Sequence, residues 1–139
     1  WAGSGVGMGG AGIGRRGRSG AGKAGLALRL IDRGATLVSD DYVEMCRDGD
    51  MIMLITPAET AGKLEIRSLG MVEMDHISGV PLRLKIRLDT DIERFPLDRQ
   101  KETIMELPVT SIALAANEPS AAIKVEMALK QVIETGRRQ

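Results

Sequence analysis

Residues 17–24, GRSGAGKA, place glycines and a lysine at the spacing of a phosphate-binding loop. In such a loop the glycines let successive backbone N–H groups turn toward an anion, and the following helix adds the positive charge of its N-terminus. The lysine reaches the β- and γ-phosphates of a nucleotide. The residues expected to bind the nucleotide are Gly17, Arg18, Ser19, Gly20, Ala21, Gly22, Lys23 and Ala24.

The last residue of this loop, Ala24, departs from the pattern, which has serine or threonine there. That hydroxyl normally ligates the Mg²⁺ of the bound nucleotide, and the methyl group of alanine cannot coordinate a hard cation. The loop therefore predicts phosphate binding more firmly than it predicts catalysis.

A pair of carboxylates, Asp40 and Asp41, follows a short apolar segment that we expect to be the strand after the first helix. Because the carboxyl ends of such strands meet at one edge of an α/β sheet, the pair is expected beside the loop. Phosphoryl transfer needs a carboxylate there, to accept the proton of the attacking hydroxyl or to hold the metal. Taken alone, the pair is better explained as an ordinary acidic turn or helix start.

Residues 1–16 are rich in glycine, and two interpretations stay open. One is a flexible, partly disordered leader, because glycine weakens strands. The other, which the motif favours, is a hairpin of strands at 3–8 and 11–16 around Gly9-Gly10 that leads into the loop. Three residues of its second strand suit a buried position poorly: Gly14, Arg15 and Arg16.

The rest of the chain must position these groups. Hydrophobic spacing predicts a helix over 24–33, ended by Gly34, and an amphipathic helix over 120–135, capped near Gly136. Between them we expect strands at 35–39, 42–47, 51–56, 63–67, 68–74 and 109–114, with a helical piece at 57–62. Residues 81–88 alternate Leu and Ile with Arg and Lys, which predicts a strand with one face in water. The pattern indicates a single α/β or mixed α+β domain spanning 1–139.

The composition excludes several classes of protein. A chain of 139 residues is long enough for one domain that buries about two thirds of its unfolded surface. Lys and Arg balance Asp and Glu at 19 each, so no general basic field argues for nucleic acid. No apolar segment approaches the roughly 18 residues of a membrane helix. The single cysteine, Cys46, fits a reducing compartment, and we expect a cytoplasmic protein without nucleic-acid or membrane partners.

Two longer segments carry a more specific pattern, GRSGAGKAGLALRLIDRGATLVSDDYVEM at 17–45 and AGKLEIRSLGMVEMDH at 61–76. In these segments the chain resembles the catalytic domain of HPr kinase/phosphorylase, in the short bacterial form that lacks an N-terminal domain. LEIRSLG is close to the LEIRGLG signature of that family, and VPLRLKIRLDTDIERFP and SAAIKVEMALKQ are more weakly similar. The resemblance implies a carboxykinase-like nucleotide-binding fold, a mixed sheet with a phosphate-loop helix and a C-terminal helix.

The resemblance also implies a reaction. The family uses ATP and Mg²⁺ to phosphorylate a serine of HPr or an HPr-like phosphocarrier protein, and it assembles as oligomers, commonly hexamers. By position, Asp41 matches the proton acceptor, a role worth roughly 10²–10⁴ in rate, and Lys23 matches the phosphate-binding lysine. Glu65 matches an acid that helps to hold Mg²⁺, with Arg67 in the same signature, and Arg94 matches an arginine that neutralises transferred charge. Without the shared pattern each of these would be an ordinary surface charge.

Departures from the family pattern limit what the resemblance implies. Ala24 replaces the serine that ligates Mg²⁺, and Ala2 stands where the family has an active-site histidine. The segment LAANEPSAA lacks the basic residues that longer members use for dephosphorylation, so phosphorylase activity is not expected. The strand entering the loop, AGIGRRG, lacks the aliphatic residues of the family. His76 is expected at the surface.

Three functional hypotheses follow. The leading one is an ATP-dependent serine kinase domain that acts on a phosphocarrier of a phosphotransferase system. The second is a catalytically impaired nucleotide-binding regulatory homologue, which Ala24 and Ala2 motivate. The third is a small-molecule kinase or a carboxykinase-like ATP enzyme, because phosphate-loop chemistry serves many substrates.

Overall fold

The computed structural model of the chain describes residues 3–17, 23–40, 42–66, 68–88, 100–115 and 118–137. Its helices are α1 (Lys23–Asp32) and α2 (Ala121–Arg137), with a 3₁₀ turn, η1 (Ala58–Thr60). The strands are β1 (Ser4–Met8), β2 (Ala11–Gly17), β3 (Thr36–Ser39), β4 (Glu44–Asp48), β5 (Met51–Ile55), β6 (Lys63–Ile66), β7 (Gly70–Glu73), β8 (Val80–Leu88), β9 (Gln100–Ile104) and β10 (Leu107–Leu114).

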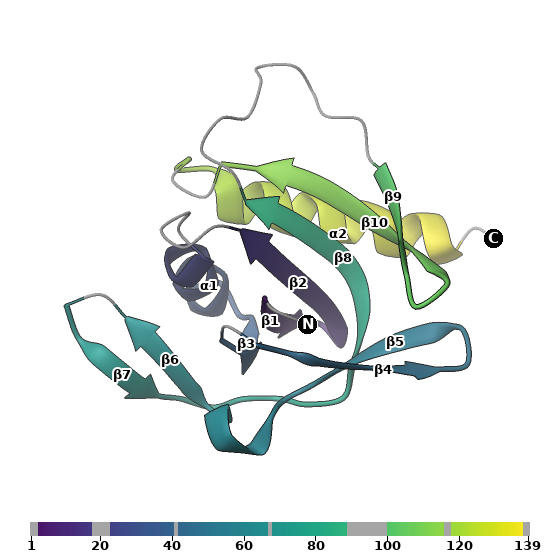
Figure 1. Cartoon of the computed structure of the whole chain (residues 1–139). Coiled ribbons are helices and arrows are strands. Elements are labelled where there is room, and N and C mark those ends of the chain that lie inside the picture. The colour runs from purple at the N-terminus through teal and green to yellow at the C-terminus, as the bar shows by residue number, and fades with distance from the viewer. Residues whose placement is uncertain are drawn as a thin grey trace.

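The main sheet is mixed and has the strand order β3-β1-β2-β8-β10-β9 (Figure 1). Strand β8 runs parallel to both β2 and β10, whereas β1 runs antiparallel to both β2 and β3. Strand β3 therefore points the same way as β2. The carboxyl ends of β2, β3, β8 and β10 meet at one edge of the sheet, which we call the carboxyl edge. Ligands of open α/β sheets bind at this kind of edge.

Strands β1 and β2 form the hairpin that the motif favours, paired from Ser4 with Arg15 to Met8 with Ala11. Gly9 and Gly10 make the two-residue turn with φ angles of 58° and 80°, which glycine adopts without steric cost. The glycines within the strands permit close packing on the sheet. A Cβ atom on Gly12 would lie 2.9 Å from the Pro81 carbonyl oxygen and from Leu54 Cδ1.

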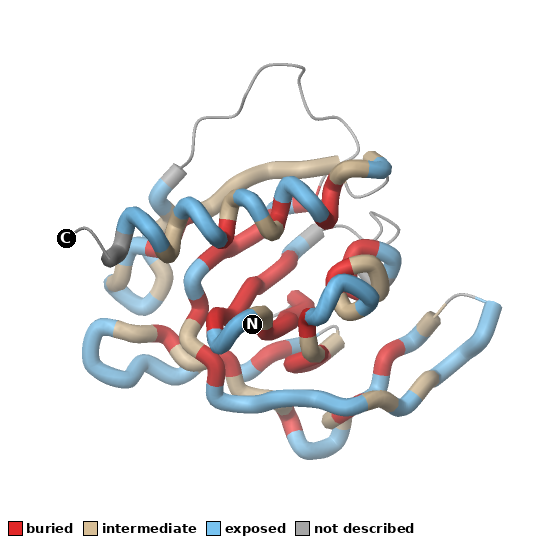
Figure 2. Tube along the Cα trace, turned by 180° about the vertical axis from the view of Figure 1, so that it is seen from behind, coloured by how far each residue is buried: buried red, intermediate tan, exposed pale blue. Residues whose placement is uncertain are grey.

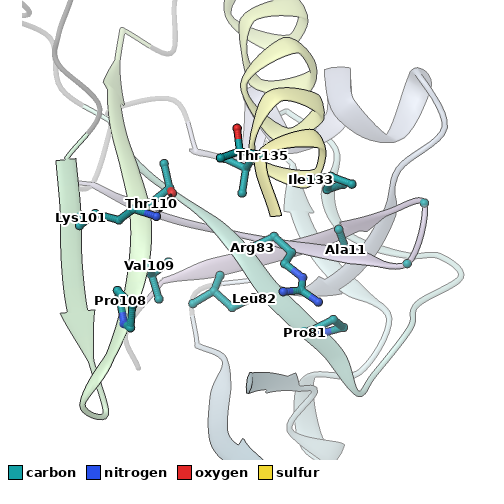
Figure 3. Close-up of a pocket in the computed structure, with 13 residues that line it drawn as sticks. Ala11, Pro81, Leu82, Arg83, Lys101, Pro108, Val109, Thr110, Ile133 and Thr135 are labelled. Atoms are coloured by element: carbon teal, nitrogen blue, oxygen red, sulfur yellow. Dashed lines mark hydrogen bonds between the residues drawn. The ribbon is translucent and has the colours of Figure 1, made fainter. Parts of the chain in front are cut away.

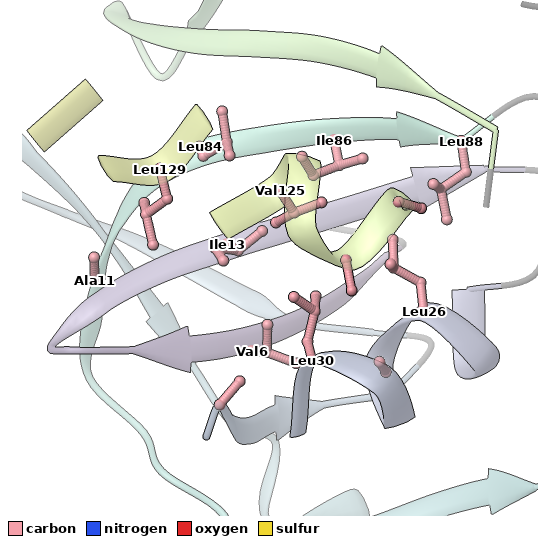
Figure 4. Close-up of a cluster of buried hydrophobic side chains, with 14 residues drawn as sticks. Val6, Ala11, Ile13, Leu26, Leu30, Leu84, Ile86, Leu88, Val125 and Leu129 are labelled. Carbon is pink, nitrogen blue, oxygen red and sulfur yellow. The ribbon is translucent and has the colours of Figure 1, made fainter. Parts of the chain in front are cut away.

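Two hydrophobic clusters lie on opposite faces of the main sheet. The helix-side cluster packs α1 and α2 against the sheet and includes Val6, Ile13, Leu26, Leu30, Leu84, Ile86, Leu88, Val125 and Leu129 (Figure 4). The hairpin-side cluster, near β4 and β5, consists of Val38, Val43, Ile52, Leu54, Val80, Leu82 and Val109. Figure 2 shows both helices on the same side of the sheet, with their exposed residues facing away from it.

Strand β8 contributes to both clusters because its pairing with β2 contains a bulge. Leu82 pairs with Gly12, whereas Leu84 pairs with the next residue of β2, Ile13. The bulged residue is Arg83, and Leu82 and Leu84 therefore face opposite sides of the sheet. The alternation predicts a strand with one face in water. This prediction is wrong, because the bulge places apolar side chains on both faces and because Lys85 is buried.

Other sequence-based boundaries differ by a few residues. Strand β9 was not predicted from its polar sequence, and it pairs with β10 at the edge of the sheet. Helix α2 continues through Gly136 to Arg137 instead of being capped near Gly136. No helix in the described part of the chain is long and apolar enough to cross a membrane.

Candidate active site

Strand β2 and helix α1 supply the strand–loop–helix arrangement that a phosphate loop requires. Strand β2 ends at Gly17 and α1 begins at Lys23, while residues 18–22 lie outside the described residues. The first N–H groups of a helix have no intrahelical acceptor and carry partial positive charge. Because the first turn of α1 contains no acidic residue, this charge is available to an anion.

Asp40 directly follows β3 at the same carboxyl edge, so it lies at the end of a strand as expected from the sequence. Its Oδ1 accepts a hydrogen bond from the Ser4 hydroxyl at 3.5 Å, and its Oδ2 accepts one from the Glu65 backbone N–H at 3.3 Å. This carboxylate therefore connects the first strand of the sheet to β6. The proposed proton acceptor, Asp41, lies outside the described residues.

Hydrogen bonds also fix the backbone on either side of the acid pair. The Ser39 hydroxyl donates to the Tyr42 carbonyl at 2.6 Å, and the Tyr42 N–H donates to the Asp40 carbonyl at 2.7 Å. The hydroxyls of Ser39 and Thr60 lie 3.4 Å apart. The segment that carries the acids is thus attached to β3 and to η1.

Arg15 is a fully buried cation in the strand that leads into the phosphate loop. It pairs with Ser4 of β1 across the sheet, and Ser4 in turn binds Asp40. Burial lowers the pKa of Arg15 to about 10, and the negative charge of Asp40 opposes this shift. Arg15 therefore remains protonated at neutral pH and supplies positive charge near Asp40.

Sequence reasoning identified Arg15 only as a poor strand residue and did not assign a separate task to Asp40. Neither role follows from a motif. The available signal is chemical complementarity: a cation in a buried strand needs a nearby anion, and an acid at the end of β3 can supply it.

Glu65 lies in the β6–β7 hairpin, and its side chain is exposed. The structure thus brings the Glu65 backbone to Asp40 beside the ends of β2 and β3. The other sequence-predicted residues Ala2, Arg67 and Arg94, and residues 18–22 of the loop, lie outside the described residues. His76 is exposed, as expected, and Cys46 lies exposed in β4.

The donors at this edge suit a nucleotide-bound magnesium ion better than a site made by protein alone. Among the described residues, no group of three or more His, Cys, Asp or Glu side chains could hold a metal ion. Mg²⁺ is usually bound through one or two carboxylates together with substrate phosphates. The exposed Glu65 carboxylate fits that requirement, whereas the Asp40 carboxylate already accepts two hydrogen bonds.

A pocket of about 630 Å³ lies away from these residues, at the opposite end of β2 (Figure 3). Its walls include the Gly9–Gly10 turn, the first half of β8, the β9–β10 hairpin and the end of α2. Its two cations do not converge on one point. Lys101 donates to the Thr110 hydroxyl at 3.2 Å, while an Arg83 nitrogen lies 3.9 Å from Met51 Sδ. The candidate active site is therefore the carboxyl edge.

Comparison with known proteins shows the family of this chain. Residues 2–137 match the family model described as HPr Serine kinase C-terminal domain. The chain belongs to this family. The resemblance of the chain to this family is thereby confirmed.

Relatives in the HPr kinase family match most of this chain. The HPr kinase/phosphorylase of Cupriavidus necator is 37% identical over 131 residues, covering 84% of this chain and 40% of its own length. That of Burkholderia cenocepacia is 33% identical over 137 residues, covering 89% of this chain and 42% of its own length. The chain thus spans about two fifths of the length of these relatives.

A solved structure confirms the fold class. The Hpr(Ser) kinase/phosphatase from Coxiella burnetii superimposes with a TM-score of 0.78 at 21% sequence identity. The match covers 99% of this chain and 95% of that one. The mixed sheet with its phosphate-loop helix and C-terminal helix is therefore the fold of an HPr kinase domain.

Proposed function

We propose that this domain transfers the γ-phosphoryl group of ATP to a serine of an HPr-type phosphocarrier protein. Family membership supports a kinase-type function, and one observation carries the proposal at the site. The end of β2, the start of α1 and Asp40 converge at the carboxyl edge, with the Glu65 backbone bound to Asp40. Phosphate binding, proton acceptance and metal ligation can all be served from this edge.

In the proposed reaction the serine oxygen attacks the γ-phosphorus, the bond to the β-phosphate oxygen breaks, and ADP leaves. The Asp41 carboxylate accepts the serine proton, a role worth roughly 10²–10⁴ in rate. Lys23 and the N–H groups of residues 17–24 neutralise the phosphates, and Arg94 neutralises the charge of the transferred group. Glu65 would hold Mg²⁺ together with the phosphates, and the ion would supply Lewis-acid stabilisation.

The second candidate is a nucleotide-binding homologue with impaired catalysis, which Ala24 supports because its methyl group offers no metal ligand. Calorimetric titration of ATP, with and without Mg²⁺, separates the two. We expect Ala24→Ser to strengthen metal-dependent binding while metal-free affinity stays similar. If Ala24→Ser leaves the affinity for ATP in the presence of Mg²⁺ unchanged, the argument from Ala24 is wrong.

Turnover is tested by incubating the domain with Mg²⁺-ATP and a purified HPr-type protein, with phosphoserine detected by mass spectrometry. We expect phosphoserine that disappears in Asp41→Asn without loss of ATP binding. Absence of phosphoserine, even in the Ala24→Ser variant, would contradict the kinase proposal. Phosphoserine formation that survives Asp41→Asn would contradict the assignment of the proton acceptor.

We further propose a cytoplasmic homo-oligomer, with a hexamer as the expected assembly. The family resemblance motivates the assembly, and the single cysteine and lack of an apolar segment motivate the compartment. Light scattering of the purified chain measures the assembly, and fractionation of the cells tests the location. A strictly monomeric species at every concentration would contradict the oligomer.

A further inference from the structure

Three cations occupy neighbouring positions at the carboxyl edge, on the face of the sheet opposite the helices. Arg16 of β2 pairs with Arg87 of β8, and Lys85 pairs with Gly14 of β2 and Ser111 of β10. Along β8, Lys85 and Arg87 alternate with Leu84, Ile86 and Leu88. These three residues belong to the helix-side cluster, so Lys85 and Arg87 face the other way. Arg16 and Arg87 are exposed, whereas Lys85 is buried.

One carboxylate near these cations is already engaged. Glu102 of β9 forms an ion pair with Lys85, with Nζ and Oε1 2.6 Å apart. The hydrogen bond from Lys85 lowers the pKa of Glu102, with smaller contributions from Ser111 and Arg16. Glu102 is thus held chiefly by the buried lysine. Within the described residues, neither Arg16 nor Arg87 makes an ion pair or hydrogen bond.

Like charges at paired positions of a sheet repel one another, and the free energy cost falls when an anion binds between them. Arginine is suited to this because its planar guanidinium can donate two parallel hydrogen bonds to a carboxylate. The exposed Arg16–Arg87 pair therefore provides a surface complementary to acidic side chains.

The location favours a protein over a nucleotide as the binding partner. Nucleotide phosphates are expected at the N-terminus of α1, which packs on the opposite face of the sheet. Arg16 and Arg87 are also absent from the walls of the described pocket. On an open surface a small anion remains hydrated, whereas a protein partner brings its own surface to exclude water.

We propose that Arg16 and Arg87 form a docking site for acidic side chains of the protein substrate, beside its phosphorylated serine. This inference rests on the proposed function, since it takes the substrate to be a protein. It adds a specificity determinant that is separate from the residues that transfer the phosphoryl group. Acidic residues near the serine would be recognised, and neutral ones would bind less tightly.

A binding experiment tests this without requiring turnover. Two serine peptides, one flanked by glutamates and one by glutamines, are titrated into the domain by NMR at low ionic strength. We expect the glutamate peptide to bind more tightly, and Arg16→Gln or Arg87→Gln to weaken it about three- to fivefold, as expected for an exposed ion pair. The glutamine peptide should be unaffected, and added salt should reduce the difference.

Arg83→Gln is the matched control, because Arg83 is also exposed and lies in β8 but at its other end. Equal weakening by Arg83→Gln would show a general charge effect and overturn the proposal. Unchanged peptide affinity in the Arg16 and Arg87 variants, or an equal loss of ATP affinity, would also overturn it. A lower melting temperature in both variants would assign the arginines to acids of this chain instead.

The same measurements separate this inference from the proposed function. Arginine-dependent binding of the glutamate peptide without phosphoserine formation would leave the docking site standing and contradict the kinase activity. Phosphoserine formation on the phosphocarrier with a KM unchanged in the double variant would support the activity and contradict the docking site.

Discussion

Arg15 is predicted to suit a buried strand position poorly, and yet it is fully buried. A guanidinium removed from water loses its hydration energy. Burial therefore destabilises the fold unless other charges and hydrogen bonds compensate for that loss. Asp40 supplies negative charge, and it is itself anchored by Ser4 and the Glu65 N–H. Strand β2 is therefore held in part by electrostatics.

A double-mutant cycle measures this interaction. We expect Arg15→Met and Asp40→Asn to be coupled by about 1–3 kcal/mol in the free energy of unfolding, because each residue compensates the charge of the other. Urea unfolding at neutral pH provides the values. The cycle between Arg16→Met and Asp40→Asn is the control, since Arg16 is exposed, and should show much weaker coupling. Additive effects for Arg15 and Asp40 would contradict the pairing.

At the residue scale, the residue pattern predicted an acid at the end of β3, where Asp40 lies, but only the family resemblance distinguished Asp41 from Asp40. Asp40 and Asp41 are chemically identical and adjacent, so only their surroundings can distinguish them. The contacts of Asp40 come from β1 and β6, which are distant in sequence. No local pattern encodes such contacts.

Among the elements, the β9–β10 hairpin has a turn whose residues do not suit its geometry. Ile104 pairs with Leu107, and the two turn residues Met105 and Glu106 have φ angles of 51° and 67°. Non-glycine residues rarely adopt this left-handed conformation, and two-residue hairpin turns favour Asn-Gly. The polar sequence of β9 and this unfavourable turn explain why the hairpin was not predicted.

Replacing Met105-Glu106 by Asn-Gly is expected to raise the free energy of unfolding by about 1 kcal/mol through relief of this strain. The change removes an ion pair between Glu106 and Arg47, but both side chains are exposed and such pairs contribute little. Thermal unfolding should show a rise of a few degrees. Asp48→Asn, which places Asn before Gly49 outside this turn, serves as a control, and an equal rise there would contradict the explanation.

For the whole molecule, the β6–β7 hairpin stands apart from the main sheet (Figure 1). Only Leu64 is buried among the residues of these two strands. A two-stranded hairpin with so little buried surface is marginally stable by itself. The Met74 N–H bond to the Gly62 carbonyl, at 2.7 Å, closes the base of this hairpin, and the Glu65 N–H bond to Asp40 connects it to the rest of the domain.

Hydrogen exchange should therefore show two levels of protection. We expect amides of β6 and β7 to exchange faster than those of β2 and β8, which lie inside the main sheet. Asp40→Asn should increase exchange in β6 by weakening the bond to Glu65, while β8 is unchanged. Equal protection of the hairpin and the main sheet in the parent protein would contradict this account.

Sequence patterns predicted the order of helices and most strands because hydrophobic periodicity is local. They did not predict how β8 is shared between the two clusters. Val80, Leu82, Leu84, Ile86 and Leu88 occupy alternate positions, which by pattern alone places them all on one face. The bulge in the pairing with β2 determines which face each of these side chains occupies, and strand pairing depends on residues that are distant in sequence.

The bulge at Arg83 has a consequence for how this gene can change in length. Deleting Arg83 would leave Leu82 and Leu84 adjacent, so that an ordinary pleat would send them to opposite faces, where they already lie. Deleting Lys85 instead would turn Ile86 and Leu88 away from the helices. The codon for Arg83 can therefore be lost without disturbing the core, whereas the codon for Lys85, two positions further along the strand, cannot.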